Sequence, residues 1–137
     1  MADRKSFDAA PRRVLVAGCG YIGLALVRQL QACGHHVWAL RRNPFPPDAL
    51  PSGVEALAAD LTQPDTLHVL PPRLDAVVVA LSPSGGDAAA YRAAYIDAPR
   101  NVLQALEPQR GAVHRLVLTS STGVFAGATS PKPFDEA

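Results

Sequence analysis

The sequence has almost no excess of charge. Its 13 lysine and arginine residues offset 12 aspartate and glutamate residues, which leaves a formal net charge of +1 at pH 7. A strongly basic chain would favour nucleic acid or an anionic membrane surface as a partner, and this balance favours neither. Long apolar runs are missing too, since none approaches the ~20 residues that a transmembrane helix needs. We therefore expect no nucleic-acid partner and no membrane span.

Cysteine is scarce, with only Cys19 and Cys33 in the chain. The helix expected between them would hold the two roughly 20 Å apart, at about 1.5 Å per residue, so a disulfide between them is not expected. There is no CxxC motif, and no two of the four histidines stand at a metal-binding spacing. The sequence therefore predicts no metal site.

The N-terminus lacks the apolar core of a secretory signal, because residues 1–13 are largely polar. We expect residues 1–11 to form a flexible leader and the protein to be cytoplasmic. The other residues, 12–137, have the length of one ordinary domain.

Short apolar runs alternate with helical patterns along the rest of the chain. The predicted strands cover residues 13–17, 36–40, 54–58, 75–81 and 114–119. Helices are predicted over residues 21–33, from a cap at Thr62 or Asp65 to about Leu70, and over residues 88–106 with a kink or break at Pro99. This alternation predicts the α/β class, a doubly wound parallel sheet of about five strands. The strand order consistent with the glycine cluster at residues 18–23 is 3-2-1-4-5.

A glycine cluster joins the first predicted strand to the first predicted helix. Gly18, Gly20 and Gly23 form G-x-G-x-x-G in the strand–helix context that dinucleotide binding requires. The first glycine permits a tight turn, the second a close approach of backbone to phosphate, and the third close packing of the helix. The positive end of the helix dipole favours the pyrophosphate. We predict a Rossmann-type dinucleotide site, with a plain strand–helix turn as the alternative; its loop residues are Gly18, Cys19, Gly20, Tyr21, Ile22 and Gly23.

The residues after the second strand favour NADP over NAD. Arg41 and Arg42 stand where an acidic residue would bind the ribose hydroxyls of NAD, and residues 38–43 contain no carboxylate. A guanidinium suits the 2′-phosphate of NADP because its charge and planar geometry match phosphate oxygens. We favour Arg41 over Arg42 as the phosphate ligand, and two solvated loop arginines are the alternative.

Two further strand ends supply candidate cofactor contacts. Asp60, followed by Leu61, comes directly after the third strand and could accept a hydrogen bond from the adenine amino group or cap a helix. Ala80, Leu81 and Ser82 end the fourth strand beside the crevice where such sheets bind ligands. Their backbone could contact the ribose or the nicotinamide end.

The end of the fifth strand completes a resemblance to a known family. Residues 119–127 read Thr-Ser-Ser-Thr-Gly-Val-Phe-Ala-Gly. Together with the glycine motif and the helix leading into the fifth strand, they make residues 12–137 resemble the short-chain dehydrogenase/reductase superfamily. The chain is most similar to its extended and atypical members, the NAD-dependent epimerase/dehydratase group. This resemblance implies hydride transfer between a nicotinamide and a carbon that bears a hydroxyl or carbonyl, often on a sugar nucleotide.

The resemblance also implies roles for single residues. In the family, a serine or threonine after strand five polarises the substrate oxygen, and a Tyr-x-x-x-Lys motif supplies the acid/base and a lysine that binds the nicotinamide ribose. It places the serine at Ser121, with Thr122 as the next candidate and Phe125 where the family usually has tyrosine. No Tyr-x-x-x-Lys occurs, since the only lysines are Lys5 and Lys132.

The sequence therefore looks like the N-terminal half of an epimerase/dehydratase-like protein, truncated after the serine motif. Its fifth strand would then be a poorly covered edge, so we expect self-association or marginal stability. The predicted function is that of an NAD(P)-binding oxidoreductase domain, and whether this chain is itself an enzyme stays open. The alternatives are a non-catalytic NADP-binding module that senses redox state or contacts a partner protein, and a fragment with no independent role.

Overall fold

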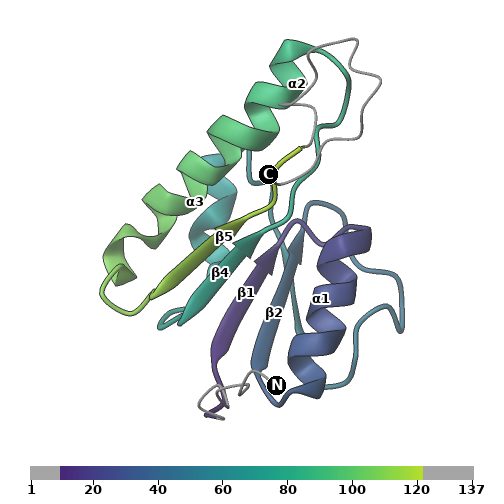
Figure 1. Ribbon diagram of the computed structural model, residues 1–137, viewed down its shortest axis with the longest axis vertical. Helices are drawn as coiled ribbons and strands as arrows, with labels where there is room; N and C mark the ends of the chain where they lie inside the picture. Colours follow the sequence, from purple (N-terminus) through teal and green to yellow (C-terminus); the bar gives the residue numbers. More distant parts are fainter. Residues whose placement is uncertain (1–9, 122–137) are drawn as a thin grey trace, which may run out of the picture.

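Five parallel strands form one sheet in the computed structural model, which describes residues 10–121 (Figure 1). Their order is β3-β2-β1-β4-β5, and every neighbouring pair is parallel, which confirms the predicted topology. The leader up to residue 9, Thr122, Phe125 and Lys132 lie outside the described residues. The strands are β1 (Arg13–Ala17), β2 (His36–Arg41), β3 (Glu55–Ala58), β4 (Ala76–Val79) and β5 (Arg115–Leu118).

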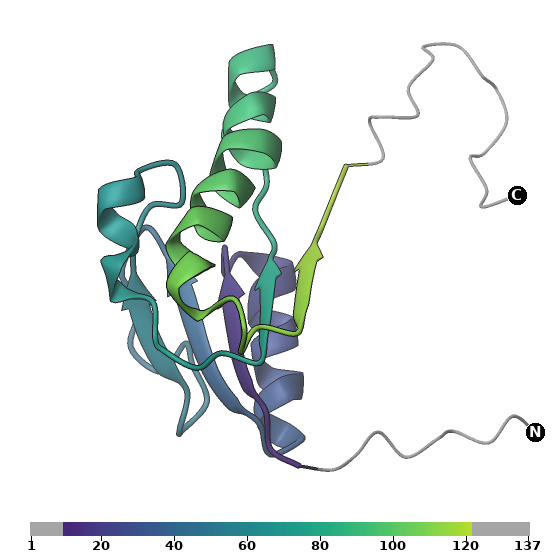
Figure 2. The same ribbon diagram turned by 90° about the vertical axis from the view of Figure 1, so that its left-hand side faces the viewer.

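Helices cover both faces of the sheet (Figures 1 and 2). One face carries α1 (Tyr21–Ala32). The other carries the 3₁₀ helix η1 (Pro64–Val69) and a long helical segment made of α2 (Ala88–Arg92), η2 (Ala93–Asp97) and α3 (Ala98–Leu106). A short 3₁₀ turn, η3 (Glu107–Gln109), leads from α3 toward β5.

The core has two parts because side chains of the central strand alternate between the faces. Leu15 of β1 packs on the α3 side with Leu40, Val77 and Val102, all fully buried. Val16 packs on the α1 side in a smaller cluster that includes Val27 and Val37. These two layers fix β1 at the middle of the sheet, so its C-terminal end points into the loop that carries the glycines.

The helix predicted to begin at Thr62 or Asp65 is a 3₁₀ helix that starts at Pro64, and neither residue is its N-cap. Gln63 occupies the cap position without a side-chain cap hydrogen bond. Thr62 is engaged instead in a turn, since its backbone N–H donates to Asp60 Oδ1 at 2.9 Å. Proline is favoured at a first helical position because it has no N–H to leave unpaired.

A kink or break was predicted at Pro99, but the helical segment is continuous there, with a π turn just before the proline. The N–H of Ala98 donates to the carbonyl of Ala93, five residues earlier. Pro99 follows as the second residue of α3 and, inside this continuous segment, has no N–H to donate to the turn before it. The wider turn thus lets the helix continue past the proline.

Two expectations from composition can be compared with residues 10–121. Cys19 is buried, Cys33 is exposed and both are free, in agreement with the expectation that no disulfide joins them. In the described part of the chain, no helix combines the length and the apolar character that a membrane crossing requires.

Candidate functional site

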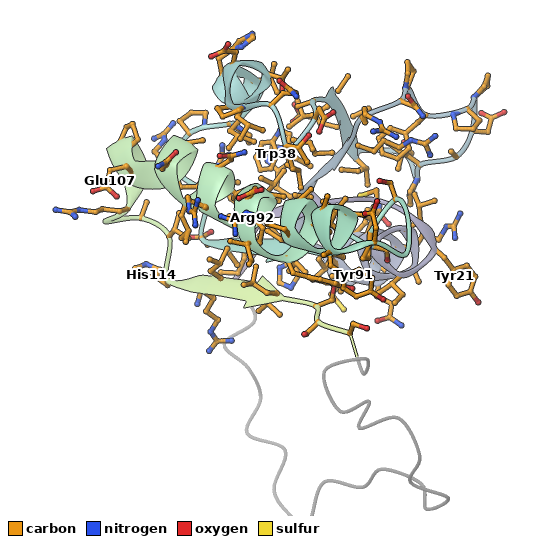
Figure 3. All side chains as sticks on the ribbon, turned by 90° about the horizontal axis from the view of Figure 1, so that it is seen from above. Tyr21, Trp38, Tyr91, Arg92, Glu107 and His114 are labelled. Carbon is orange, nitrogen blue, oxygen red and sulfur yellow. The ribbon has the colours of Figure 1, made fainter. Side chains whose placement is uncertain are left out.

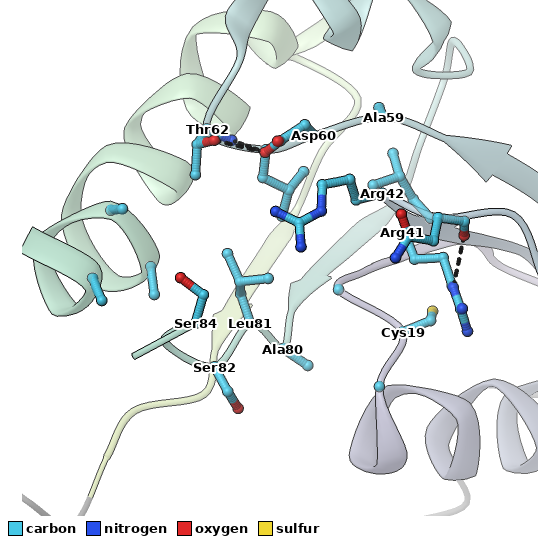
Figure 4. Close-up of a pocket in the computed structure, with 18 residues that line it drawn as sticks. Cys19, Arg41, Arg42, Ala59, Asp60, Thr62, Ala80, Leu81, Ser82 and Ser84 are labelled. Carbon is cyan, nitrogen blue, oxygen red and sulfur yellow. Dashed lines mark hydrogen bonds between the residues drawn. The ribbon is translucent and has the colours of Figure 1, made fainter. Parts of the chain in front are cut away.

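A cleft of about 440 Å³ opens at the C-terminal ends of the strands, between the glycine loop and the α2–η2 helix (Figure 4). The segments that follow β1, β2, β3 and β4 each supply part of its wall. This is the edge at which doubly wound sheets bind their ligands, because the chain reverses its winding direction there. The predicted site residues that line it are Gly18, Cys19, Gly20, Arg41, Arg42, Asp60, Leu61, Ala80, Leu81 and Ser82.

Three residues of the predicted loop do not line the cleft. Tyr21 is 94% exposed and its side chain points away from the body of the protein (Figure 3). Ile22 is also exposed, while Gly23 is buried behind the loop. Only backbone groups of these residues therefore remain as candidates for contact with a ligand.

At two positions of the glycine loop, neighbouring backbone is too close to leave room for a side chain. Gly18 has φ +88°, and a Cβ there would lie 2.8 Å from the carbonyl oxygen of Ala80. A Cβ on Gly23 would lie 2.8 Å from the carbonyl oxygen of Gly18. Gly20 differs, because a Cβ there would meet no atom within 4 Å. Gly18 and Gly23 thus shape the loop, and Gly20 leaves open space beside it.

The N-terminus of α1 borders this open space. Gly20 is its N-cap, no side chain caps the helix, and its first turn holds no acidic residue. The N–H of Leu24 is satisfied by the Gly20 carbonyl at 3.0 Å, but a helix leaves its first N–H groups without a helical partner. Free N–H groups beside an open glycine fit a pyrophosphate, which would bind to them and to the positive end of the helix dipole.

The two arginines at the C-terminal end of β2 have different surroundings. The Arg41 Nε donates to the Asn43 carbonyl at 2.7 Å, and its guanidinium carbon lies 4.9 Å from the centroid of the Phe45 ring. The Arg42 side chain instead extends into the cleft, on the side of Asp60 (Figure 4). The sequence favoured Arg41 as the phosphate ligand. The geometry instead favours Arg42, because its charged group is the one available to a ligand in the cleft.

Asp60 presents a charged carboxylate to the cleft. Its Oδ1 accepts hydrogen bonds from the Thr62 N–H at 2.9 Å and from the Thr62 hydroxyl at 2.7 Å. Burial raises the pKa of Asp60, but the Thr62 hydrogen bonds and the Arg42 charge outweigh it, so the net pKa lies below the usual value. Asp60 therefore shapes its own turn while it remains an acceptor at neutral pH.

Cys19 lines the cleft as a neutral thiol. Its Sγ donates to the Val16 carbonyl at 3.2 Å. Burial raises its pKa to about 11, and a backbone hydrogen bond at Leu40 and the Arg41 charge offset only part of this effect. Because the thiolate is the reactive form, this residue contributes packing rather than nucleophilic chemistry.

Sequence reasoning missed several residues that build the site. Asn101 of α3 donates from its side-chain amide to the Leu61 carbonyl at 2.9 Å and so ties the Asp60 turn to the helix. Ala90, Ala93 and Ala94 line the cleft, and their small side chains leave it open. The i, i+3, i+4 spacing of the three alanines is visible in the sequence and indicates that they share one helix face. The Asn101–Leu61 hydrogen bond joins residues 40 positions apart, so no pattern of neighbouring residues could have predicted it.

Ser121 follows β5 and is half-buried, but it does not line this cleft. Thr122, the next candidate, lies outside the described residues. The role that the family resemblance gives to Ser121 therefore stays a prediction.

All the residues that line the cleft lie within the part of the chain that matches a known protein family. Residues 18–137 match the family model described as NAD(P)H-binding. The 2'-dehydrokanamycin reductase of Streptomyces kanamyceticus is 40% identical over 80 residues, which cover 56% of this chain and 22% of that protein.

Two solved structures are similar to this chain over most of its length. A Burkholderia cenocepacia protein assigned as an epimerase has 29% identity and a TM-score of 0.74, over 92% of this chain and 43% of that one. The Bordetella bronchiseptica enzyme WbmG, crystallised with NAD and UDP, has 20% identity and a TM-score of 0.68, again over 92% and 43%. The second match shows a shared fold only. This chain thus spans less than half the length of these relatives.

Proposed function

Because the chain belongs to the NAD(P)H-binding family, within the short-chain dehydrogenase/reductase superfamily of reductases and epimerases, we propose that its cleft binds NADP in preference to NAD. One observation carries this preference: Arg42 extends into the cleft directly after β2 (Figure 4). No carboxylate stands beside it on that strand end to bind the ribose hydroxyls of NAD.

Different residues of the cleft would bind different parts of the dinucleotide. The free N–H groups at the N-terminus of α1, beside Gly20, would hold the pyrophosphate, because the N–H groups of residues 18–20 already donate to backbone carbonyls. Arg42 would pair with the 2′-phosphate. Asp60 would accept a hydrogen bond from the adenine amino group, and the backbone of Ala80 to Ser82 would contact the ribose or the nicotinamide end. When bound, the nicotinamide supplies or accepts a hydride.

For the whole protein we propose an oxidoreductase or epimerase that acts at a hydroxyl or carbonyl carbon, with a sugar nucleotide as one candidate substrate class. That class follows from the family resemblance, and this chain would contribute the cofactor-binding part. Ser121 would hydrogen-bond the reacting oxygen of the substrate.

The coenzyme preference predicts different effects for the two arginines. The chain should bind NADPH about tenfold more tightly than NADH, which corresponds to about 1.4 kcal/mol. Arg42→Ala should remove this preference by weakening NADPH about tenfold while leaving NADH unchanged, because only NADPH carries the 2′-phosphate. Fluorescence titration of the purified chain with both coenzymes measures the four dissociation constants.

Arg41→Ala is the matched control, since it removes the same side chain one position earlier. It should leave the ratio of the two dissociation constants near that of the unchanged protein. Equal affinity of the unchanged protein for NADPH and NADH, or loss of the preference in Arg41→Ala alone, would contradict the proposal.

We also infer that β5 pairs with a second copy of the chain. Within residues 10–121, β5 has a strand partner on one side only, and its Val117 and Leu118 are 50% and 48% exposed. An unpaired apolar strand edge tends to find another strand. Analytical ultracentrifugation should show a concentration-dependent dimer, and Val117→Lys should shift it toward monomer. A monomer at every concentration would argue against this contact.

A further inference from the structure

A second, smaller pocket adjoins the cleft where β4 and β5 end beneath η2. Its volume is about 90 Å³, and Leu81 and Ala94 line both hollows. The smaller pocket is therefore next to the place where a dinucleotide in the cleft passes the end of β4. It is smaller than the ~150 Å³ cavity that encloses a benzene in another protein, so it accepts only part of a ligand.

No charged side chain lines this pocket, and its polar side-chain groups are all hydroxyls. Its polar side chains are Tyr95, Thr119 and Ser120, and all its other lining residues are apolar. The Thr119 hydroxyl already faces the Val79 carbonyl at 3.5 Å. Among residues 10–121, the hydroxyls of Tyr95 and Ser120 make no hydrogen bond, so two donors from two different elements remain available.

The π turn brings Tyr95 to this position. Ala94 and Pro99, five residues apart, both line the pocket, and this is the spacing of the hydrogen bond that closes the π turn. Such turns often occur at functional sites, where the extra residue changes the direction of side chains. Tyr95 is half-buried and Ser120 is exposed, so the pocket has an apolar inner wall and an open side at the end of β5.

We propose that this pocket binds an uncharged group of the substrate that carries one hydroxyl or carbonyl oxygen, held by hydrogen bonds from Tyr95 and Ser120. The inference rests on the proposed function, because it places this group next to the bound dinucleotide. A charged group is excluded, since it would lose hydration without gaining a counter-charge. Tyr95 is thus a substrate-selecting residue that lies outside the motifs of the family resemblance.

The test uses the 137-residue chain loaded with NADPH and titrated with cyclopentanone, an uncharged ketone of six heavy atoms. Backbone amide shifts of Ala94, Tyr95 and Ser120 report binding by nuclear magnetic resonance. Tyr95→Phe removes only a hydroxyl and should weaken cyclopentanone at least fivefold, as should Ser120→Ala. Cyclopentylamine, which is protonated at pH 7, should bind at least fivefold more weakly than the ketone.

Tyr91→Phe is the matched control, because Tyr91 lies on the same helical segment with its ring centroid 5.8 Å from that of Tyr95 but does not line the pocket. It should bind cyclopentanone like the unchanged chain, and every variant should keep the NADPH dissociation constant. Equal weakening in Tyr91→Phe and Tyr95→Phe, or no shift at Ala94 and Ser120, would overturn the pocket assignment. Failure of NADPH to bind would overturn the proposed function instead, and the ketone titration of the free chain would still test the pocket.

Discussion

Replacing Gly18 with alanine should lower the free energy of unfolding by about 3 kcal/mol and abolish dinucleotide binding. The backbone of Gly18 has φ +88°, a conformation that costs an alanine about 1–2 kcal/mol. The new Cβ would also lie 2.8 Å from the Ala80 carbonyl oxygen. Gly18 directly follows β1 and Ala80 directly follows β4, so neither backbone segment can move without disturbing its strand. Forced repacking of this kind costs a further ~1–3 kcal/mol.

Gly34→Ala separates the two contributions. Gly34 has φ +85°, but a Cβ there would meet no atom within 4 Å, so this variant has the backbone strain without the collision. It should lose about 1–2 kcal/mol and keep its affinity for NADPH. Urea unfolding monitored by circular dichroism measures both variants. Equal destabilisation of the two would show that the contact between Gly18 and Ala80 does not fix the loop.

Gly20→Val should have nearly the opposite profile. It should lose at most about 1 kcal/mol of stability, because valine is a poorer N-cap than glycine, and at least about 100-fold in NADPH affinity, or about 2.7 kcal/mol. No atom lies within 4 Å of a Cβ on Gly20, so the folded chain tolerates the side chain. The same space is where the backbone must approach the pyrophosphate, and a valine would fill it. The melting temperature and a fluorescence titration with NADPH measure the two properties.

The matched control for this change is Gly111→Val. Gly111 also has no atom within 4 Å of its Cβ position, and it lies in the turn before β5, away from the cleft. Its affinity for NADPH should be unchanged. Normal NADPH binding by Gly20→Val would mean that the pyrophosphate does not lie against this residue.

The parts of the fold that sequence could predict are those set by neighbouring residues. The apolar residues of β1 and the glycines that follow it mark a buried strand and a tight turn, and both are where the sequence placed them. The strand order was the one consistent with the glycine motif between the first strand and the first helix. Pro99 indicated a kink or break, whereas the structure has a π turn just before it, with Ala94 and Ala98 buried.

The parts that sequence could not predict depend on contacts across space. Arg41 and Arg42 are equivalent in a linear reading, and they differ because Arg41 bonds Asn43 and lies over Phe45. The Asp60 turn is held by Asn101, which a sequence pattern does not connect to it. The small pocket under η2 likewise requires the ends of β4 and β5 to meet one turn of a helix.

The central claim is that the loop from Gly18 to Gly23 binds a pyrophosphate beside the N-terminus of α1. Titration of the ¹⁵N-labelled chain with NADPH, followed through its backbone amide resonances, tests this claim most directly. The largest shifts should fall on residues 18–24, with smaller ones at Arg42, Asp60 and Ala80–Ser82. Saturable binding that leaves the amides of Gly18, Gly20 and Gly23 unshifted would contradict the account.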